Sequence, residues 1–130
     1  MSSFSACVAV IDERLRQDKK FGVQDHLSVP NFVRGKPNVA CAHSKVPVAS
    51  YMREYNDTLV SFQRLTWGPI LVEEVSEALE AAASESPAAL RAELVQVAAV
   101  AVAWIDCLDR NGDVIGTGVF RRVRPPRSPK

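Results

Sequence analysis

The feature that most constrains the fold is a pair of adjacent helical patterns between Trp67 and Arg110. The sequence WGPILVEEVSEALEAA is followed, after a break at Ser84–Pro87, by AALRAELVQVAAVAVAWIDCLDR, and apolar residues recur at helical spacing in both. On a helical wheel the second pattern is apolar nearly all round, which indicates a helix buried on more than one face. One chain of 130 residues could barely enclose such a helix, so we expect a homo-oligomer (dimer or tetramer) whose interface this helix helps to form.

Two further amphipathic helices are predicted, over residues 4–19 and 48–65. Their apolar stripes are Phe4, Val8, Ile11 and Leu15 in the first, and Met52, Tyr55, Leu59 and Phe62 in the second. Between them, residues 22–47 lose all periodicity and contain several prolines and glycines, which predicts a long loop.

Four helices without a confident strand predict an all-α fold, a four-helix bundle over residues 1–111. We expect Pro69 in the first turn of the third helix and Ser86 as the N-cap of the fourth. Residues 112–130 follow a helix stop at Asn111-Gly112. They contain GDVIGTGVF, which could form a short strand or lie extended, and then an Arg/Pro-rich tail.

Acidic and amide side chains recur at the same place on the third and fourth helices. Glu74 and Glu77 are three residues apart, as are Glu93 and Gln96, so each pair lies on one helix face. Antiparallel packing of the two helices would bring both pairs to one cleft. Spacing alone leaves two alternatives open, a solvated acidic face or a divalent cation site, and clustered oxygens without His or Cys would favour Mg²⁺ or Mn²⁺.

The acidic pattern resembles that of a known enzyme family. Glu73-Glu74-x-x-Glu77, then fifteen residues, then Glu93-x-x-Gln96 is similar to the EExxE…ExxD motif of MazG-like all-α nucleoside triphosphate pyrophosphohydrolases. The stretch LRAELVQVAAVAVAWIDCLDR resembles the last helix of phage-type dATP/dGTP pyrophosphohydrolases in that superfamily, and ERLRQDKKFGVQDH resembles their ERxRQ…GxQxH opening.

The resemblance implies a Mg²⁺-dependent hydrolysis of a nucleoside triphosphate (NTP or dNTP) to a nucleoside monophosphate and pyrophosphate. It implies metal ligands at Glu74, Glu77, Glu93 and Gln96, with Glu73 and Glu77 in catalysis. Gln96 departs from the family pattern, which has Asp there. An amide oxygen can ligate a hard cation but cannot act as a base. The alternative is therefore a protein on the same fold that binds a nucleotide or nucleotide signal without hydrolysing it, and a third possibility is an interaction module with surface acids.

Side chains outside the acidic pattern could bind the substrate's phosphates or base. The candidates are Arg14, Gln17, Lys20, Gln24, His26 and Trp67. For each there is a simpler alternative, because the first five fit a solvated helix end and loop, and Trp67 fits core packing.

Charge, cysteine content and hydropathy indicate which partners and which cellular compartment to expect. Five of the 16 basic residues lie in the last ten positions, which leaves an acidic body and makes a nucleic-acid partner unexpected. Three distant cysteines without a CxxC pair fit reduced thiols and a cytoplasmic protein. The apolar run Val95–Ile105 is shorter than the about 20 residues that span a bilayer, so no membrane association is expected.

Overall fold

The computed structural model describes residues 4–84 and 86–111, and this part of the chain is helical with no strand. It contains α1 (Phe4–Phe21), a 3₁₀ turn η1 (Asn31–Val33), α2 (Pro37–His43), α3 (Ala49–Ser61), α4 (Trp67–Ala82) and α5 (Pro87–Asn111). The all-α prediction is confirmed. The predicted extended segment GDVIGTGVF and the basic tail lie outside the described residues.

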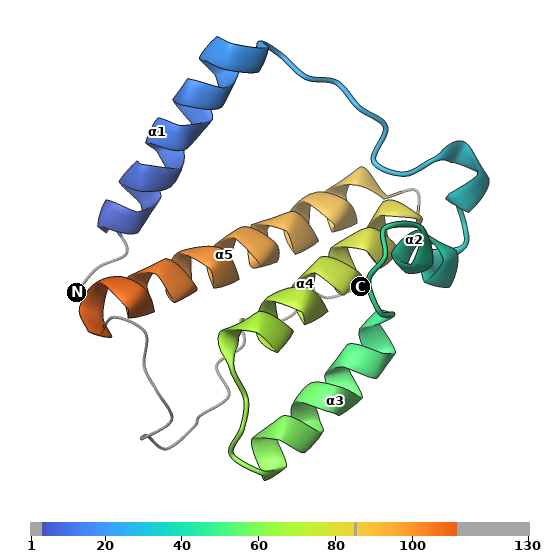
Figure 1. Cartoon of the computed structure of the whole chain (residues 1–130). Coiled ribbons are helices and arrows are strands. Elements are labelled where there is room, and N and C mark those ends of the chain that lie inside the picture. The colour runs from blue at the N-terminus through green and yellow to red at the C-terminus, as the bar shows by residue number, and fades with distance from the viewer. Residues whose placement is uncertain (1–3, 85, 112–130) are drawn as a thin grey trace.

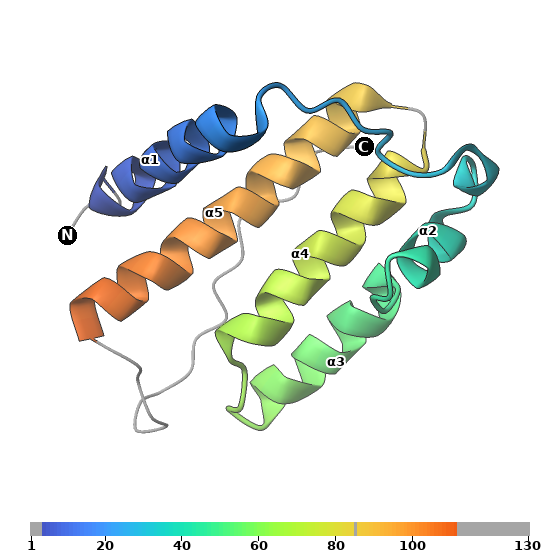
Figure 2. The same ribbon diagram turned by 45° about the horizontal axis from the view of Figure 1, so that its top comes forward.

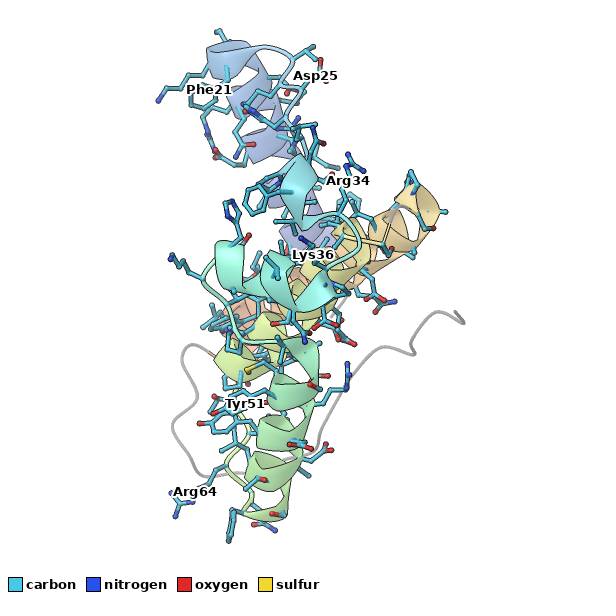
Figure 3. The ribbon with its side chains drawn as sticks, turned by 90° about the vertical axis from the view of Figure 1, so that its right-hand side faces the viewer. Phe21, Asp25, Arg34, Lys36, Tyr51 and Arg64 are labelled. Atoms are coloured by element: carbon cyan, nitrogen blue, oxygen red, sulfur yellow. The ribbon has the colours of Figure 1, made fainter. Side chains whose placement is uncertain are left out.

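Helix α4 is the central element, since α5, α3 and α2 all pack against it. The four longer helices lie side by side in the order α1, α5, α4, α3 (Figures 1 and 2). Within the described ranges α1 contacts α5 alone among the helices, and α3 does not contact α5. Figure 3 shows Phe21 of α1 and Tyr51 of α3 well apart along this array. The described chain is thus an open array, and a four-helix bundle completed by oligomerisation stays a prediction.

Local sequence signals set the starts of α4 and α5. Pro69 lies in the first turn of α4, where its missing N–H leaves no intrahelical bond unmade. Ser86 precedes α5, and its Oγ accepts a hydrogen bond from the backbone N–H of Ala89 at 3.2 Å. Both expectations are confirmed, because they depend on bonds within one turn and not on tertiary contacts.

The prediction of a structureless loop over residues 22–47 is wrong in part, because this segment contains η1 and α2. Pro37 starts α2, whose seven residues are too few to show a clear periodicity. Ala40 and Cys41 of α2 are fully buried, and the backbone N–H of Gly35 donates to Ala83 O at 2.7 Å. Tertiary contacts at the C-terminal end of α4 therefore hold this segment in place.

Of the two predicted apolar stripes, that of α3 is buried only in part and that of α1 does not face the core. Helix α3 buries Met52 and Asn56, whereas Tyr55 and Phe62 are exposed. Helix α3 also ends at Ser61, four residues earlier than predicted. Two residues later, the backbone of Gln63 takes a positive φ of 55°. In α1 the whole stripe of Phe4, Val8, Ile11 and Leu15 is exposed, and Ala6 is the one buried residue.

Helix α5 is longer than the apolar run that marked it in the sequence. By length and composition it could cross a membrane, and it is the one such helix in the described part of the chain. The core helix of a soluble protein passes the same test, and α5 packs against α4. In its most apolar window 11% of the residues are fully buried. Residues 101–105 are partly buried, whereas Leu94 and Val95 are about half exposed.

Candidate metal centre

Three carboxylates of α4 meet in the interior. Glu73, Glu74 and Glu77 are 2%, 3% and 3% exposed, and one oxygen of each lies within 4.8 Å of the others. Positions i, i+1 and i+4 span about 100° of the helix circumference, so one short arc of α4 presents all three. We call these three residues the acidic group. Glu74 and Glu77 are thus on one face, as their spacing predicted, and Glu73 joins them.

The burial of these carboxylates bears on one of the two interpretations of the acidic pattern. Removing carboxylates from water is costly, and placing like charges close together adds to the cost. A solvated acidic face is therefore wrong for these three residues. Three carboxylate oxygens this close together could hold a hard divalent cation such as Mg²⁺.

Helix α3 supports the acidic group from the other side. Asn56 is fully buried, and its Nδ2 donates to Glu73 Oε1 at 2.8 Å and to Pro69 O at 3.0 Å. Among the described residues no hydrogen-bond donor reaches its Oδ1, which is also buried. Arg53, one turn earlier, places Nη1 3.4 Å from Glu77 Oε2 and is partly exposed.

Sequence reasoning missed Arg53 and Asn56. Their i,i+3 spacing within the predicted helix 48–65 was the available signal, because it places a cation and an amide on one face. Nothing in the sequence connected that face to the acids, which follow about twenty residues later.

Glu80 belongs to a separate, structural arrangement. Its Oε2 accepts a hydrogen bond from the backbone N–H of Ala49 at 2.7 Å and lies 3.8 Å from Cys41 Sγ. Burial, together with the negative charge of Glu80 and its hydrogen bond, raises the pKa of the Cys41 thiol to about 11. Glu80 therefore joins α4 to α2 and to the start of α3.

The predicted ligands of the fourth helix lie on α5. Glu93 is buried and Gln96 is partly buried, on a helix that packs against α4. Glu93 is not among the carboxylates that meet within 4.8 Å in the described part of the chain. The structure thus brings together the α4 half of the predicted ligand set and places the other half on the neighbouring helix.

The predicted phosphate-binding residues lie elsewhere. Arg14, Gln17 and Lys20 are on α1, which contacts α5 and not α4 within the described ranges. Arg14 donates to Gln17 and to Asp18 of its own helix. His26 Nε2 lies 3.2 Å from Gln24 Oε1 on the exposed segment after α1. The structure does not place these side chains beside the acidic group.

Trp67 packs against α5. Its ring is stacked on that of Trp104, with the centroids 6.4 Å apart and the planes 11° from parallel. Both residues are partly buried. The pair joins the first turn of α4 to the C-terminal half of α5, which is the packing alternative named for Trp67 in the sequence.

Comparison of the chain with protein-family models, with curated proteins and with solved structures finds no match.

Proposed function

We propose that this protein is a Mg²⁺-dependent nucleoside triphosphate pyrophosphohydrolase, with an NTP or dNTP as its substrate. The observation that carries the proposal is the buried meeting of Glu73, Glu74 and Glu77. The resemblance of the acidic sequence pattern to MazG-like enzymes supports the same reaction class. The open array of helices and the exposed Leu94 and Val95 of α5 support action as a homo-oligomer. We also propose a cytoplasmic location.

The proposed roles follow from chemistry and position. Glu74 and Glu77, with Glu93 and Gln96 from α5, would hold Mg²⁺, for which Mn²⁺ could substitute. A bound Mg²⁺ would offset phosphate charge and lower the pKa of a bound water.

Glu73 would orient and deprotonate the water that attacks the α-phosphorus, with pyrophosphate as the leaving group. The hydrogen bond from Asn56 fixes the Glu73 carboxylate for this role. Arg53, partly exposed beside Glu77, is suited to contact a phosphate oxygen.

Product analysis tests the proposal. The protein is incubated with a panel of NTPs and dNTPs plus Mg²⁺, and monophosphate and pyrophosphate are quantified. We expect Glu77→Gln to lower kcat by at least 100-fold, because the variant keeps the shape of the side chain and loses its charge. The matched control is Glu54→Gln on the exposed face of α3, which should keep full activity. Turnover that is equal in both variants would rule out the acidic group as the active site.

A second candidate function is nucleotide binding without hydrolysis, and Gln96 favours it because an amide cannot replace an aspartate as a base. Calorimetric titration of the same nucleotides with Mg²⁺ would then show binding without products. Gln96→Asp tests the assignment directly. If this variant gains hydrolysis, the substitution at residue 96 accounts for the missing activity. If neither binding nor turnover is found for any nucleotide, an interaction module is the remaining interpretation.

A further inference from the structure

The apolar stripe of α1 points away from its own subunit. Phe4, Val8, Ile11 and Leu15 fall within about 60° of the helix circumference, and they are 74%, 37%, 57% and 63% exposed. The two residues of α1 that are not exposed, Ala6 and Gln17, lie about 200° round the helix from Phe4. Helix α1 therefore contacts α5 through the face opposite its stripe, at the edge of the array (Figure 2).

Such an arrangement leaves α1 with little stabilisation inside one chain. Helices in proteins gain most of their stability from packing an apolar face, and α1 has 18 residues to stabilise. Here the packed face contributes one buried alanine. The four large side chains that would supply the hydrophobic free energy are on the other side.

We infer that the stripe of α1 is the contact surface for a second copy of this chain, whose α1 packs against it antiparallel about a two-fold axis. The stripe has spacings of four, three and four residues, as in the a and d positions of a coiled coil. These spacings are symmetric about a point between Ala9 and Val10. A two-fold axis at that point places Phe4 opposite Leu15 of the second copy and Val8 opposite Ile11.

Self-pairing buries the same surface twice. An isologous contact of this kind covers the stripe on both copies. Specific, stable interfaces bury about 1,200–2,000 Å² in total, so surface beside the stripe is needed as well. Helix α5 extends the apolar surface next to α1, because Leu94 and Val95 are also about half exposed.

The charges of α1 favour a second copy over a membrane surface. Helices that bind anionic membranes carry mainly Lys and Arg on the polar face. On α1, Arg14 is paired with Asp18 and Arg16 with Glu13, so two of its four cations are already neutralised. Residues 4–21 contain three acids and four bases, and this near-neutral, mixed surface can face a copy of itself without repulsion.

This inference goes beyond the proposed function, because it uses no residue of the acidic group. Its test is the molar mass in solution, measured by light scattering and by sedimentation over a range of protein concentrations. We expect the full chain to form a dimer or a dimer-based assembly through α1. Ile11→Glu should reduce the mass to half or weaken association at least 100-fold.

The matched control is Ala9→Glu, which adds the same charge at an exposed position on the flank of α1. It should associate like the unmodified chain, and circular dichroism should show equal helix content for the two variants. A monomeric full chain, or association that Ile11→Glu leaves unchanged, would overturn the inference. So would co-flotation of the protein with phosphatidylcholine–phosphatidylserine vesicles that Ile11→Glu abolishes.

Cross-linking tests the antiparallel register. In a Cys7→Ser, Cys107→Ser background, one protein carries Val8→Cys and the other Ile11→Cys. Oxidation of the mixture should give a disulfide-linked dimer, whereas each protein alone should stay unlinked. Linking of each protein to itself would indicate a parallel pairing and overturn the two-fold antiparallel geometry. A dimer without hydrolysis would refute the proposed reaction alone. Hydrolysis by a monomer would refute this inference and the proposed homo-oligomer, and would leave the proposed reaction standing.

Discussion

At the scale of single residues, Asn56 is the side chain on which the acidic group most depends. Its amide is fully buried, and it donates to the carboxylate of Glu73 and to the carbonyl of Pro69. An amide can donate two hydrogen bonds to acceptors without adding charge, which no carboxylate can do. Asn56 thus connects α3 to the first turns of α4 and fixes Glu73 at the same time.

Replacing this amide by a carboxylate should therefore be costly. We expect Asn56→Asp to lower the free energy of unfolding by about 1–3 kcal/mol at pH 7, since it removes a donor and adds a buried like charge. The loss should shrink as the pH falls, because the crowded new carboxyl has a raised folded-state pKa and its protonated form can donate again. Urea unfolding at pH 7 and pH 5 without divalent cations measures both effects. Asn38→Asp, on the exposed part of α2, is the control, and equal stability of the two variants would contradict the prediction.

Cys41 gives a second prediction at this scale. Its pKa is raised from 9.0 to about 11 in the folded protein, so the folded state disfavours the thiolate. The protonated Cys41 thiol therefore contributes its full share to the free energy of unfolding below pH 9. This contribution is lost as the pH rises from about 9 to about 11, because the unfolded chain releases the thiol proton at a lower pH than the folded protein does. The denaturation midpoint of the unmodified chain should therefore fall more steeply over that interval than the midpoint of Cys41→Ala. Parallel slopes would show that Cys41 does not contribute.

At the scale of elements, α3 is capped by another helix. Val48 precedes α3 and provides no side-chain hydrogen bond to its first turn. Glu80 of α4 does so instead, by accepting from the backbone N–H of Ala49. A charged acceptor at a helix N-terminus is also favoured by the helix dipole.

Removing this tertiary cap should loosen the start of α3. Glu80→Ala leaves the buried N–H of Ala49 without its acceptor, and we expect a loss of about 1–3 kcal/mol in the free energy of unfolding. Glu80→Gln keeps an acceptor oxygen and should lose less than Glu80→Ala. Urea unfolding followed by circular dichroism distinguishes the two, with exposed Glu54→Ala as the control. The assignment fails if Glu80→Ala is as stable as the control.

The elements that were predictable are those with local signals. Helices α4 and α5 carry long periodic patterns, with Pro69 and Ser86 at their starts. Helix α2 has no such pattern, because its seven residues depend on contacts with α4. The face that α1 buries was also unpredictable, since its position depends on a small contact at Ala6 and not on the stripe.

The candidate site also contains some residues that the sequence predicts and others that only the packing of the helices brings together. The spacing of Glu74 and Glu77 placed them on one face in advance, because one helix positions both. The roles of Asn56 and Arg53 depend on how α3 packs on α4, which no pattern in one helix reveals.

At the scale of the whole molecule, cation binding should be coupled to stability. An ion that binds the folded state alone stabilises it by about 2.7 kcal/mol at 100 times its Kd. We expect millimolar Mg²⁺ to raise Tm relative to a chelated sample, and Glu77→Gln to lose most of that rise. Glu54→Gln should keep it. A Tm that does not respond to Mg²⁺ or Mn²⁺ in the unmodified chain would contradict the metal centre.

The stacked pair of Trp67 and Trp104 determines what an optical experiment on this protein can detect. The chain has two tryptophans, and both lie in this one contact between α4 and α5. Tryptophan fluorescence therefore monitors the contact between those two helices, and no tryptophan lies on α1. Circular dichroism at 222 nm includes the 18 residues of α1. If α1 melts separately on dilution, the ellipticity will fall while the emission spectrum stays constant. Comparison of the two signals then shows whether α1 unfolds before the contact between α4 and α5 is lost.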